Sequence, residues 1–553
     1  MKGTDSMERS IALPKAFRGD VDVSEAILDT YSEDTSIFKI YPKAVVYPRD
    51  AADLSVLIKY AQRQRGAVSL TARSAGTDMS GGPLTDSIVV DFTRYFNTIG
   101  KVTKDYATTQ PGVYYRDFEK VTLEQNSILP SYTASKDLNT VGGMVANNSA
   151  GEKSLTYGKT ERYTRSLNVV LQDGVEYTFS KINRKQLEAK KKLDTYEGVV
   201  YREVEALIQK HHKAIVAAKP TVSKNSAGYG IWNVWDEACD TFDLTQLFVG
   251  SQGTLGFITN ITFDLVDVRP ASRMLVMFLR PKHVARLGEM VNTVLREKPE
   301  SFESYDDKTF SVMIRVFPKL FKRLGGNPFK LARDFWPEIK MILTGGLPKM
   351  VLMAEFYAQT DGAAASIARR AAETVTSMYG VATRVTRSKE ESNKFWIIRR
   401  ESFNLLRQNV RNKHTAPFID DIVVAPQYLP EFLPRLYAML DEYDLVYTVA
   451  GHVGDGNFHI IPLMDFSRSD FTQVINELSE RVYTLVCEFH GSITGEHNDG
   501  LIRTPYLHKM FSPEMLAVFQ EIKEIFDPYR IFNPHKKVDP KPELLRTALK
   551  KQT

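Results

Sequence analysis

The sequence predicts an α+β protein made of two unlike domains. From Ser36 to Arg269, short β-branched runs such as SIVVDF alternate with helix-like stretches such as AADLSVLIKYAQRQRGA, which indicates mixed helices and strands. After Met274, amphipathic stretches such as AAASIARRAAETVTSMYG are interleaved with strand-like runs such as MVLMAEFYA, which is typical of helices packed on an antiparallel sheet. Pro270 separates the two patterns, and we place the domain boundary there.

These patterns divide the chain into four segments. We expect an N-terminal extension over residues 1–35, a first domain over 36–270, a second domain over 271–500, and a C-terminal helix and extended segment over 501–553. The C-terminal helix is the run SPEMLAVFQEIKEIF, which ends before Pro528 because proline cannot continue a helix. The length of 553 residues fits several domains of about 150 residues each.

Composition and charge exclude several classes of protein. Hydrophobic residues make up 43% of the chain and charged residues 25%, which are ordinary globular values. The net charge of +5 is small for this length and gives no support for a nucleic-acid partner. Lysines cluster between Lys181 and Leu193 and at the C-terminus. We interpret these clusters as a solvated helix face and a tail, with contact to an anionic membrane surface as the alternative.

The sequence lacks the signals of membrane insertion and of built-in electron carriers. No apolar run approaches the roughly 18 to 20 residues of a spanning helix, and the N-terminus lacks the apolar centre of a secretory signal. We therefore expect a cytoplasmic protein, peripheral to the inner face of a membrane at most. Cys239 and Cys487 form no CxxC pattern, so any electrons must pass to an acceptor outside this chain.

Three glycine-rich loops lie in the first domain: SAGTDMSGG from Ser74, TVGGMVANNSAG from Thr140 and GSQGTLG from Gly250. Such density of glycine marks backbone that turns tightly or approaches a ligand closely. The first loop lies between two strand-like runs and offers backbone N–H groups and hydroxyls that suit a pyrophosphate, although it has no GK[ST] signature. A plain turn would explain one such loop but explains three less well.

Histidines are concentrated in GHVGDGNFHI from Gly451 and in GSITGEHNDG from Gly491. The glycines make a helix improbable, and a sharp turn through GDGN would bring His452 and His459 together. In an extended GEHND segment, Glu496 and the next residue would point to opposite sides. Two histidines and a carboxylate are a recurrent catalytic metal set, but hydrogen-bonded structural histidines remain the alternative.

The runs RSAGTDMSGG, LPSYTASKDLNTVGGMVANNSAGEKSLTYGKT and KNSAGYGIWNVWDEACDTFDLTQLFVGSQGTLGFIT resemble the FAD-binding domain of vanillyl-alcohol-oxidase flavoproteins. From about Tyr41 to Lys537, the chain resembles the D-2-hydroxyacid dehydrogenases of that superfamily, which act on D-lactate, D-2-hydroxyglutarate or glycolate. This resemblance implies a two-lobed FAD-binding domain of the PCMH type, a substrate (cap) domain of antiparallel sheet with helices, and a C-terminal segment that packs back on the FAD domain and returns to the flavin.

The resemblance also implies which residues bind the flavin. Family members with covalent flavin carry histidine where this chain has Thr77, so we expect noncovalent FAD. The expected flavin-binding residues are Arg73, Ser74, Ala75, Gly76, Thr77, Asp78, Ser80, Gly81, Pro130, Asp137, Thr140, Gly142, Gly143, Asn148, Ser149, Gly253, Ile258, Thr259, Asn533 and Lys536.

For the metal and the substrate, the resemblance implies a further set. His452, His459 and Glu496 match residues that hold a divalent ion, which we expect to be Zn with Mn or Fe as alternatives, and His497 matches the catalytic base. The expected substrate-binding residues are Arg399, in a family-like WxxR context, its neighbour Arg400, Asn457 and Lys413. The usual Lys-Tyr-Asp context of the last residue is replaced here by HTAPFIDDIVVAP.

The resulting hypothesis is an FAD- and metal-dependent dehydrogenase of a small D-2-hydroxy acid. D-lactate, oxidised to pyruvate by hydride transfer to FAD, is the expected substrate, with D-2-hydroxyglutarate and glycolate as alternatives. The external acceptor would be a quinone, a cytochrome, an iron–sulfur protein or an electron-transfer flavoprotein. Two other classes stay open: a non-redox flavin transferase of the ether-lipid synthase type, and a non-catalytic FAD-binding subunit.

Overall fold

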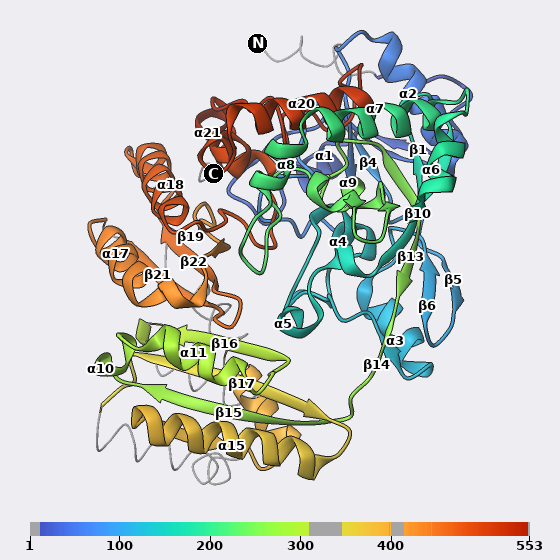
Figure 1. The fold of residues 1–553 in the computed structure, drawn as a ribbon. Helices are drawn as coiled ribbons and strands as arrows, with labels where there is room; N and C mark the ends of the chain where they lie inside the picture. Colours follow the sequence, from blue (N-terminus) through green and yellow to red (C-terminus); the bar gives the residue numbers. More distant parts are fainter. Residues whose placement is uncertain (1–10, 309–345, 398, 400–413, 444, 551–553) are drawn as a thin grey trace.

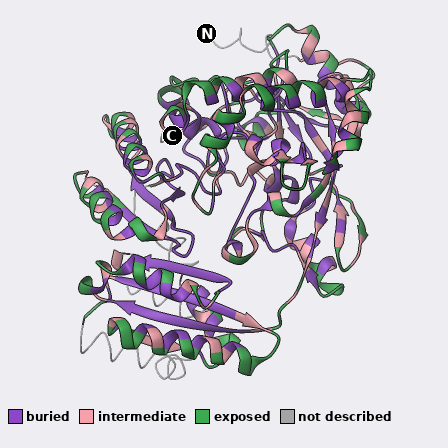
Figure 2. Cartoon of the chain, in the orientation of Figure 1, coloured by how far each residue is buried: buried purple, intermediate pink, exposed green. Residues whose placement is uncertain are grey.

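The computed structural model describes residues 11–308, 346–397, 399, 414–443 and 445–550. It has the predicted α+β architecture, with several sheets and with helices on their outer faces (Figure 1). Strands are largely buried, while the helices turn an exposed face outward (Figure 2).

A four-stranded sheet forms the first lobe of the first domain, in the order β1 (Asp20–Asp22), β2 (Ala44–Tyr47), β4 (Ile88–Asp91), β3 (Leu70–Arg73). The last three strands run parallel. β2 and β4 are buried at every position, as expected of parallel strands covered on both faces. The first of the predicted glycine-rich loops begins directly after β3 and is thereby fixed to this sheet.

An antiparallel five-stranded sheet forms the second lobe. Its order is β5 (Ile99–Val102), β6 (Tyr106–Thr109), β13 (Phe257–Asp264), β8 (Thr164–Val170), β9 (Glu176–Ser180). Burial alternates along β13, which reads FITNITFD, so one face packs on the core. The two lobes together confirm the predicted two-lobed domain.

The second domain is built on a large antiparallel sheet. Its order is β18 (Ala382–Val385), β15 (Ala271–Leu279), β17 (Met350–Ala358), β16 (Ser301–Asp306), β21 (Val446–His452), β22 (Asn457–Met464), β19 (His414–Thr415), and β20 (Ile422–Val423) also pairs with β22. Helix α15 (Asp361–Tyr379) packs on β15 and β17 through a row of buried alanines. This agrees with the predicted antiparallel sheet covered by helices.

Both ends of the described chain pack on the first domain. Helix α20 (Pro513–Phe526) contacts α7 (Tyr196–Lys210) and α8 (His212–Ala218). At the other end, β1 forms the edge of the first sheet, although it lies within the predicted N-terminal extension. The division of the chain at residues 35, 270 and 500 stays a prediction. Within the described residues, no helix has both the length and the apolar character needed to cross a bilayer.

Candidate active site

A cavity of about 670 Å³ opens between the two domains. One part of its wall comes from the glycine-rich loops of the first domain, and the other part comes from β21, β22 and the loop around Glu496. A cavity of this size holds a cofactor-sized ligand. The predicted flavin loops and the predicted histidine cluster therefore face one shared space.

The loop after β3 is built to bind an anion. Within the described residues, none of the backbone N–H groups from Ala75 to Met79 donates a hydrogen bond. The carboxylate of Asp78 instead accepts hydrogen bonds from the backbone of Ser80 and Gly82, which fixes the end of the loop. Unused N–H groups beside a cavity suit a pyrophosphate, so this loop fits FAD.

Twelve of the predicted flavin residues line the cavity, and the others lie outside its wall. The lining residues are Arg73, Ser74, Gly76, Thr77, Asp78, Asp137, Thr140, Gly142, Gly143, Ser149, Gly253 and Ile258. The others are Ala75, Ser80, Gly81, Pro130, Asn148, Thr259, Asn533 and Lys536. Two of these act on the lining loops from behind: Asn533 Nδ2 donates to the carbonyls of Gly82 and Gln252, and Lys536 Nζ donates to the carbonyl of Leu84.

The histidines of GHVGDGNFH converge as the spacing predicts. β21 and β22 form a hairpin in which His452 pairs with Asn457, and Ala450 pairs with His459. The two imidazole rings lie 5.4 Å apart between centroids. Gly456 makes the turn possible with a φ of +68°, a conformation that glycine adopts without strain.

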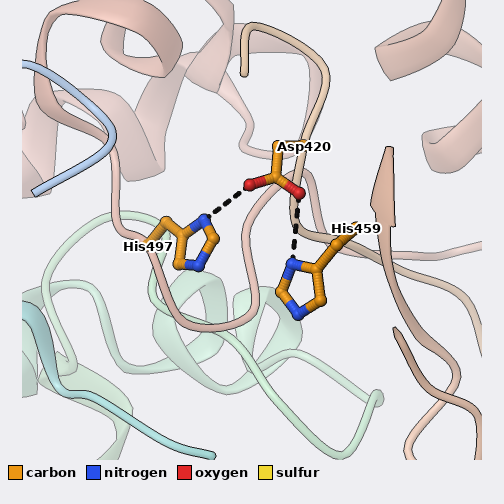
Figure 3. A group of neighbouring side chains, drawn as sticks. All are labelled: Asp420, His459 and His497. Atoms are coloured by element: carbon orange, nitrogen blue, oxygen red, sulfur yellow. Dashed lines mark hydrogen bonds and ion pairs between the residues drawn. The ribbon is translucent and has the colours of Figure 1, made fainter. Parts of the chain in front are cut away.

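Buried carboxylates orient these rings. Glu303 Oε1 lies 2.5 Å from His452 Nδ1, and Asp420 Oδ1 lies 3.1 Å from His459 Nδ1. Asp420 also reaches His497, whose Nδ1 lies 3.0 Å from Asp420 Oδ2 (Figure 3). A carboxylate on Nδ1 of a histidine leaves Nε2 for a metal or a substrate.

The loop that carries Glu496 and His497 differs from the extended segment that we expected. Both backbone N–H groups donate to one oxygen of Asp421, at 2.8 and 2.7 Å, so the chain bends around this carboxylate. Both side chains consequently line the same cavity rather than pointing to opposite sides. The prediction of opposite directions was wrong because a buried aspartate, and not strand pairing, sets the local backbone.

The ligand atoms of His452, His459 and Glu496 all lie within 4.8 Å of one another, which is compact enough for one cation. Burial works to raise the pKa of Glu496, but the ammonium of Lys224, 2.6 Å from Glu496 Oε1, and His452 lower it to about 2. Burial lowers the pKa of His452 well below its usual value. An ionised carboxylate and a neutral imidazole are the forms that bind metal, so these residues fit a divalent ion.

His497 is held in a strongly anionic environment. Burial by itself would lower the pKa of this imidazole, but the carboxylates of Asp421 and Asp420 raise it to about 9. The pKa of Asp420 is lowered, because His497 and His459 outweigh its burial. His497 is thus a strong proton acceptor placed beside the ligand set, with Nε2 as the ring nitrogen that Asp420 does not contact.

Among the predicted substrate residues, Arg399 lines the cavity and lies 2.5 Å from Glu303 Oε2. Asn457 lies behind the wall, where its side chain donates to Asp421 and to the carbonyl of Ile422. It therefore supports the loop around Glu496 from outside the cavity. Arg400 and Lys413 lie outside the described residues.

Sequence reasoning missed the four charged residues that surround the ligand set, namely Lys224, Glu303, Asp420 and Asp421. The adjacent aspartates carried a signal, because the run FIDDIVVAP places two carboxylates in an apolar segment where burial must be compensated. Glu303 and Lys224 lie in runs that gave no such signal.

Comparison with known families supports the flavin assignment. Residues 42–180 match the family described as "FAD binding domain". Residues 269–537 match "FAD linked oxidases, C-terminal domain". The chain belongs to the FAD-linked oxidase family. The glycine-rich loop from Ser74 to Gly82 lies in the first matched region and the histidine cluster in the second, so the cavity lies where the two matched domains meet.

Known relatives of this FAD-linked oxidase share about a quarter of its sequence. D-2-hydroxyglutarate dehydrogenase of Escherichia coli (strain K12) is 26% identical over 537 residues, covering 94% of this chain and 50% of that protein. The chain thus spans about half the length of that relative. The glycolate oxidase subunit GlcD of Bacillus subtilis (strain 168) is 25% identical, covering 92% and 91%. D-lactate dehydrogenase of Anaerostipes hadrus is 24% identical, covering 92% of each chain.

Solved structures show the same fold. p-Cresol methylhydroxylase has a TM-score of 0.65 at 14% identity, over 94% of each chain. Alkyldihydroxyacetonephosphate synthase has a TM-score of 0.62 at 15% identity, over 93% of this chain and 82% of that one. At these low identities, the likenesses establish only the fold of this chain.

Proposed function

We propose that this FAD-linked oxidase is a metal-dependent dehydrogenase that oxidises a small D-2-hydroxy acid to the 2-oxo acid and passes the electrons to an external acceptor. D-lactate, giving pyruvate, is the proposed substrate. The observation that carries this proposal is the convergence of His452, His459 and Glu496 beside His497, in the same cavity as the glycine-rich loop after β3.

Each group has a part in this chemistry. When bound, FAD takes up a hydride, and a divalent ion lowers the pKa of a coordinated hydroxyl. Arg399 supplies the guanidinium that binds the substrate carboxylate. His497 accepts the hydroxyl proton at Nε2, while Asp420 holds its Nδ1. A cation bound by the neighbouring ligands would oppose protonation of His497 and so favour the neutral ring that can accept a proton.

The wall beyond the histidines favours a short substrate. On the cavity side of the hairpin, Ala450 is followed by the cross-strand pair Thr448 and Ile461. None of these side chains carries a charge. Among the described lining residues, the cations are Arg73 and Arg399, and Arg73 is held by the carbonyls of Tyr31 and Glu33. Beside this uncharged wall, Arg399, which pairs with Glu303, is the cation proposed for a single substrate carboxylate, and this is consistent with a monocarboxylic acid such as D-lactate.

D-2-hydroxyglutarate is the alternative substrate, because several relatives, including the one from Escherichia coli, carry that name. Glycolate is a further alternative, supported by the name of the Bacillus subtilis relative. A second carboxylate would need a further cation, and Lys413, one of the predicted substrate-binding residues, lies outside the described residues. These alternatives are therefore separated by comparing the turnover rates of 2-hydroxy acids of different length, measured on protein with the same metal content.

Two measurements test the proposal. Absorbance spectra and elemental analysis of the purified chain should give one flavin and one divalent ion per molecule. Reduction of a dye acceptor should be fastest with D-lactate, slower with D-2-hydroxyglutarate and glycolate, and abolished by chelation. A flavin-free and metal-free protein, or turnover that a chelator leaves unchanged, would contradict the proposal. Faster turnover of D-2-hydroxyglutarate would retain the enzyme class and change the substrate.

A further inference from the structure

Glu303 is a buried carboxylate in the middle of the large sheet. It lies on β16, where every residue is buried, and its own side chain is fully inaccessible to solvent. A carboxylate in this position needs charged partners, because burial without them strongly disfavours its ionised form. The charged partners of Glu303 therefore indicate its role.

The two oxygens of Glu303 serve two different functional groups. Oε1 lies 2.5 Å from Nδ1 of His452, and Oε2 lies 2.5 Å from Nη2 of Arg399. One carboxylate thus connects a proposed metal ligand to the proposed substrate arginine. A purely structural acid on this strand would need neither partner.

Contact with Glu303 fixes the chemical state of His452. A carboxylate accepts hydrogen bonds, so Nδ1 of His452 carries the proton and donates it to Glu303. Nε2 then presents its lone pair toward the cavity, where it lies 3.3 Å from Glu496 Oε1. Such carboxylate partners orient metal-binding imidazoles and make them more basic.

Contact with Glu303 also changes Arg399. The negative carboxylate neutralises the guanidinium in the absence of substrate and holds it against the cavity wall. A guanidinium has five N–H donors, so it can retain Glu303 while it binds a substrate carboxylate. Glu303 therefore sets the position of Arg399 and weakens its attraction for anions.

We propose that Glu303 is a positioning residue that presents His452 Nε2 to the metal and holds Arg399 against the cavity wall with its charge neutralised, which weakens the attraction of Arg399 for anions. This inference rests on the proposed function for the roles of those two partners. Glu303 itself acts through His452 and Arg399, because it lies behind them in the sheet.

The test substitutes Glu303→Gln, which keeps the size of the side chain and removes its charge. A matched control is Glu355→Gln on the adjacent strand β17. Glu355 is also buried, but its oxygens accept from Ser272, Tyr357 and the indole N–H of Trp396. Flavin content and circular dichroism establish that both variants are folded.

The first readout is zinc affinity, measured on full-length flavoprotein in competition with a chromophoric chelator. We expect the dissociation constant of Glu303→Gln to rise by about 10- to 100-fold, and that of Glu355→Gln to change by less than about threefold. Equal affinities for wild type and Glu303→Gln would overturn the inference. If Glu303→Gln does not fold, Glu303→Asp is measured instead: its shorter side chain should raise the constant at least threefold, and an unchanged value would again overturn it.

The second readout is binding of propionate, a monocarboxylate that does not chelate, to metal-free flavoprotein through the flavin spectrum. Glu303→Gln should bind propionate more tightly than wild type, by about threefold or more, because Arg399 is no longer neutralised. Unchanged or weaker binding would contradict the role assigned at Arg399. Neither readout needs turnover. A wild-type protein without activity would argue against the proposed function. An active wild type together with a Glu303→Gln variant that binds zinc as tightly as wild type would argue against this inference alone.

Discussion

At the scale of single residues, Asp420 connects the two histidines on which the proposed chemistry depends. Its oxygens lie 3.1 Å from Nδ1 of His459 and 3.0 Å from Nδ1 of His497 (Figure 3). The carboxylate is completely buried, so its charge acts on both rings through a medium of low polarity. One side chain thereby orients a proposed metal ligand and a proposed base together.

Replacement of Asp420 by asparagine should therefore affect metal binding and turnover together. Asp420→Asn keeps the shape but removes the charge, so we expect about 10- to 100-fold weaker metal binding and a kcat lower by about 10² or more at saturating metal. Chelator competition and dye reduction measure the two effects. Asp465→Asn, beyond the end of β22, is the control and should change neither. A variant with normal kcat at saturating metal would exclude Asp420 as the partner of His497.

At the scale of residues, some positions of the site could be predicted from the sequence and others could not. The glycines around His452 and His459 excluded a helix, so their convergence followed from local rules of backbone conformation. Asp420 and Glu303 act through contacts with partners 39 and 149 residues away, and such contacts have no local signature. Asn457 was expected at the substrate, because its place in the turn does not reveal that its amide bonds to Asp421.

At the scale of elements, the hairpin of β21 and β22 positions the ligand set, and its turn depends on Gly456. A Cβ at this position would lie 1.8 Å from the carbonyl oxygen of Val424, and the φ of +68° disfavours any other residue. Because the turn fixes the register between the strands, it also fixes the distance between the two imidazoles.

We expect Gly456→Ala to lower the free energy of unfolding by about 2 kcal/mol or more and to reduce metal occupancy. Gly362→Ala, in the first turn of α15, is the matched control, because no atom lies within 4 Å of the added Cβ. Alanine there should stabilise the protein by about 0.5 to 1 kcal/mol. Denaturant unfolding and elemental analysis check both variants, and equal stability of the two would show that the turn tolerates a side chain.

The N-terminal segment of residues 31–35, which contacts Arg73 and the glycine-rich loop after β3, is a second element that shapes the cavity. Thr35 donates from its backbone N–H to the carbonyl of Asp78, and the Arg73 guanidinium donates to the carbonyls of Tyr31 and Glu33. Asp34 is buried in this segment, and burial together with the nearby Asp78 raises its pKa to about 7.

This shift predicts a pH dependence of stability. The folded protein retains the Asp34 proton up to about pH 7, whereas the unfolded chain releases it near 3.8, so the stabilising contribution is lost as pH rises through this interval. Asp34→Asn should gain stability relative to wild type between pH 4 and 7, by up to about 4 kcal/mol. Thermal unfolding across this range measures the gain. Exposed Asp29, whose pKa is lowered by Lys39, provides an Asn control without such a gain.

At the scale of the whole molecule, the cofactor cavity is assembled from distant parts of the chain. Asn533 donates to the carbonyls of Gly82 and Gln252, and so connects two glycine-rich loops from the C-terminal segment. Lys523 adds a hydrogen bond to the carbonyl of Thr254. The order of strands and helices was predictable from local patterns, but these connections were not, because they depend on how the domains pack.

Removal of the Asn533 amide should weaken flavin binding. Asn533→Ala leaves two buried carbonyl groups without this donor, and we expect the dissociation constant of FAD to rise about tenfold, or about 1.4 kcal/mol. Fluorescence titration of the flavin-free protein measures this change. Asn97→Ala removes an exposed amide that also bonds two carbonyls, those of Thr93 and Arg94, and should leave FAD affinity unchanged. An equal effect of both substitutions would show that FAD binding does not depend on the hydrogen bonds by which Asn533 connects the two loops.

The contacts of Asn533 also determine when the cavity can form during synthesis. Loops made early in translation, such as the one that ends at Gly82, are held by a side chain that is made 451 residues later. A nascent chain that has not yet reached Asn533 lacks that support, so we expect these loops to take their final arrangement only late in synthesis.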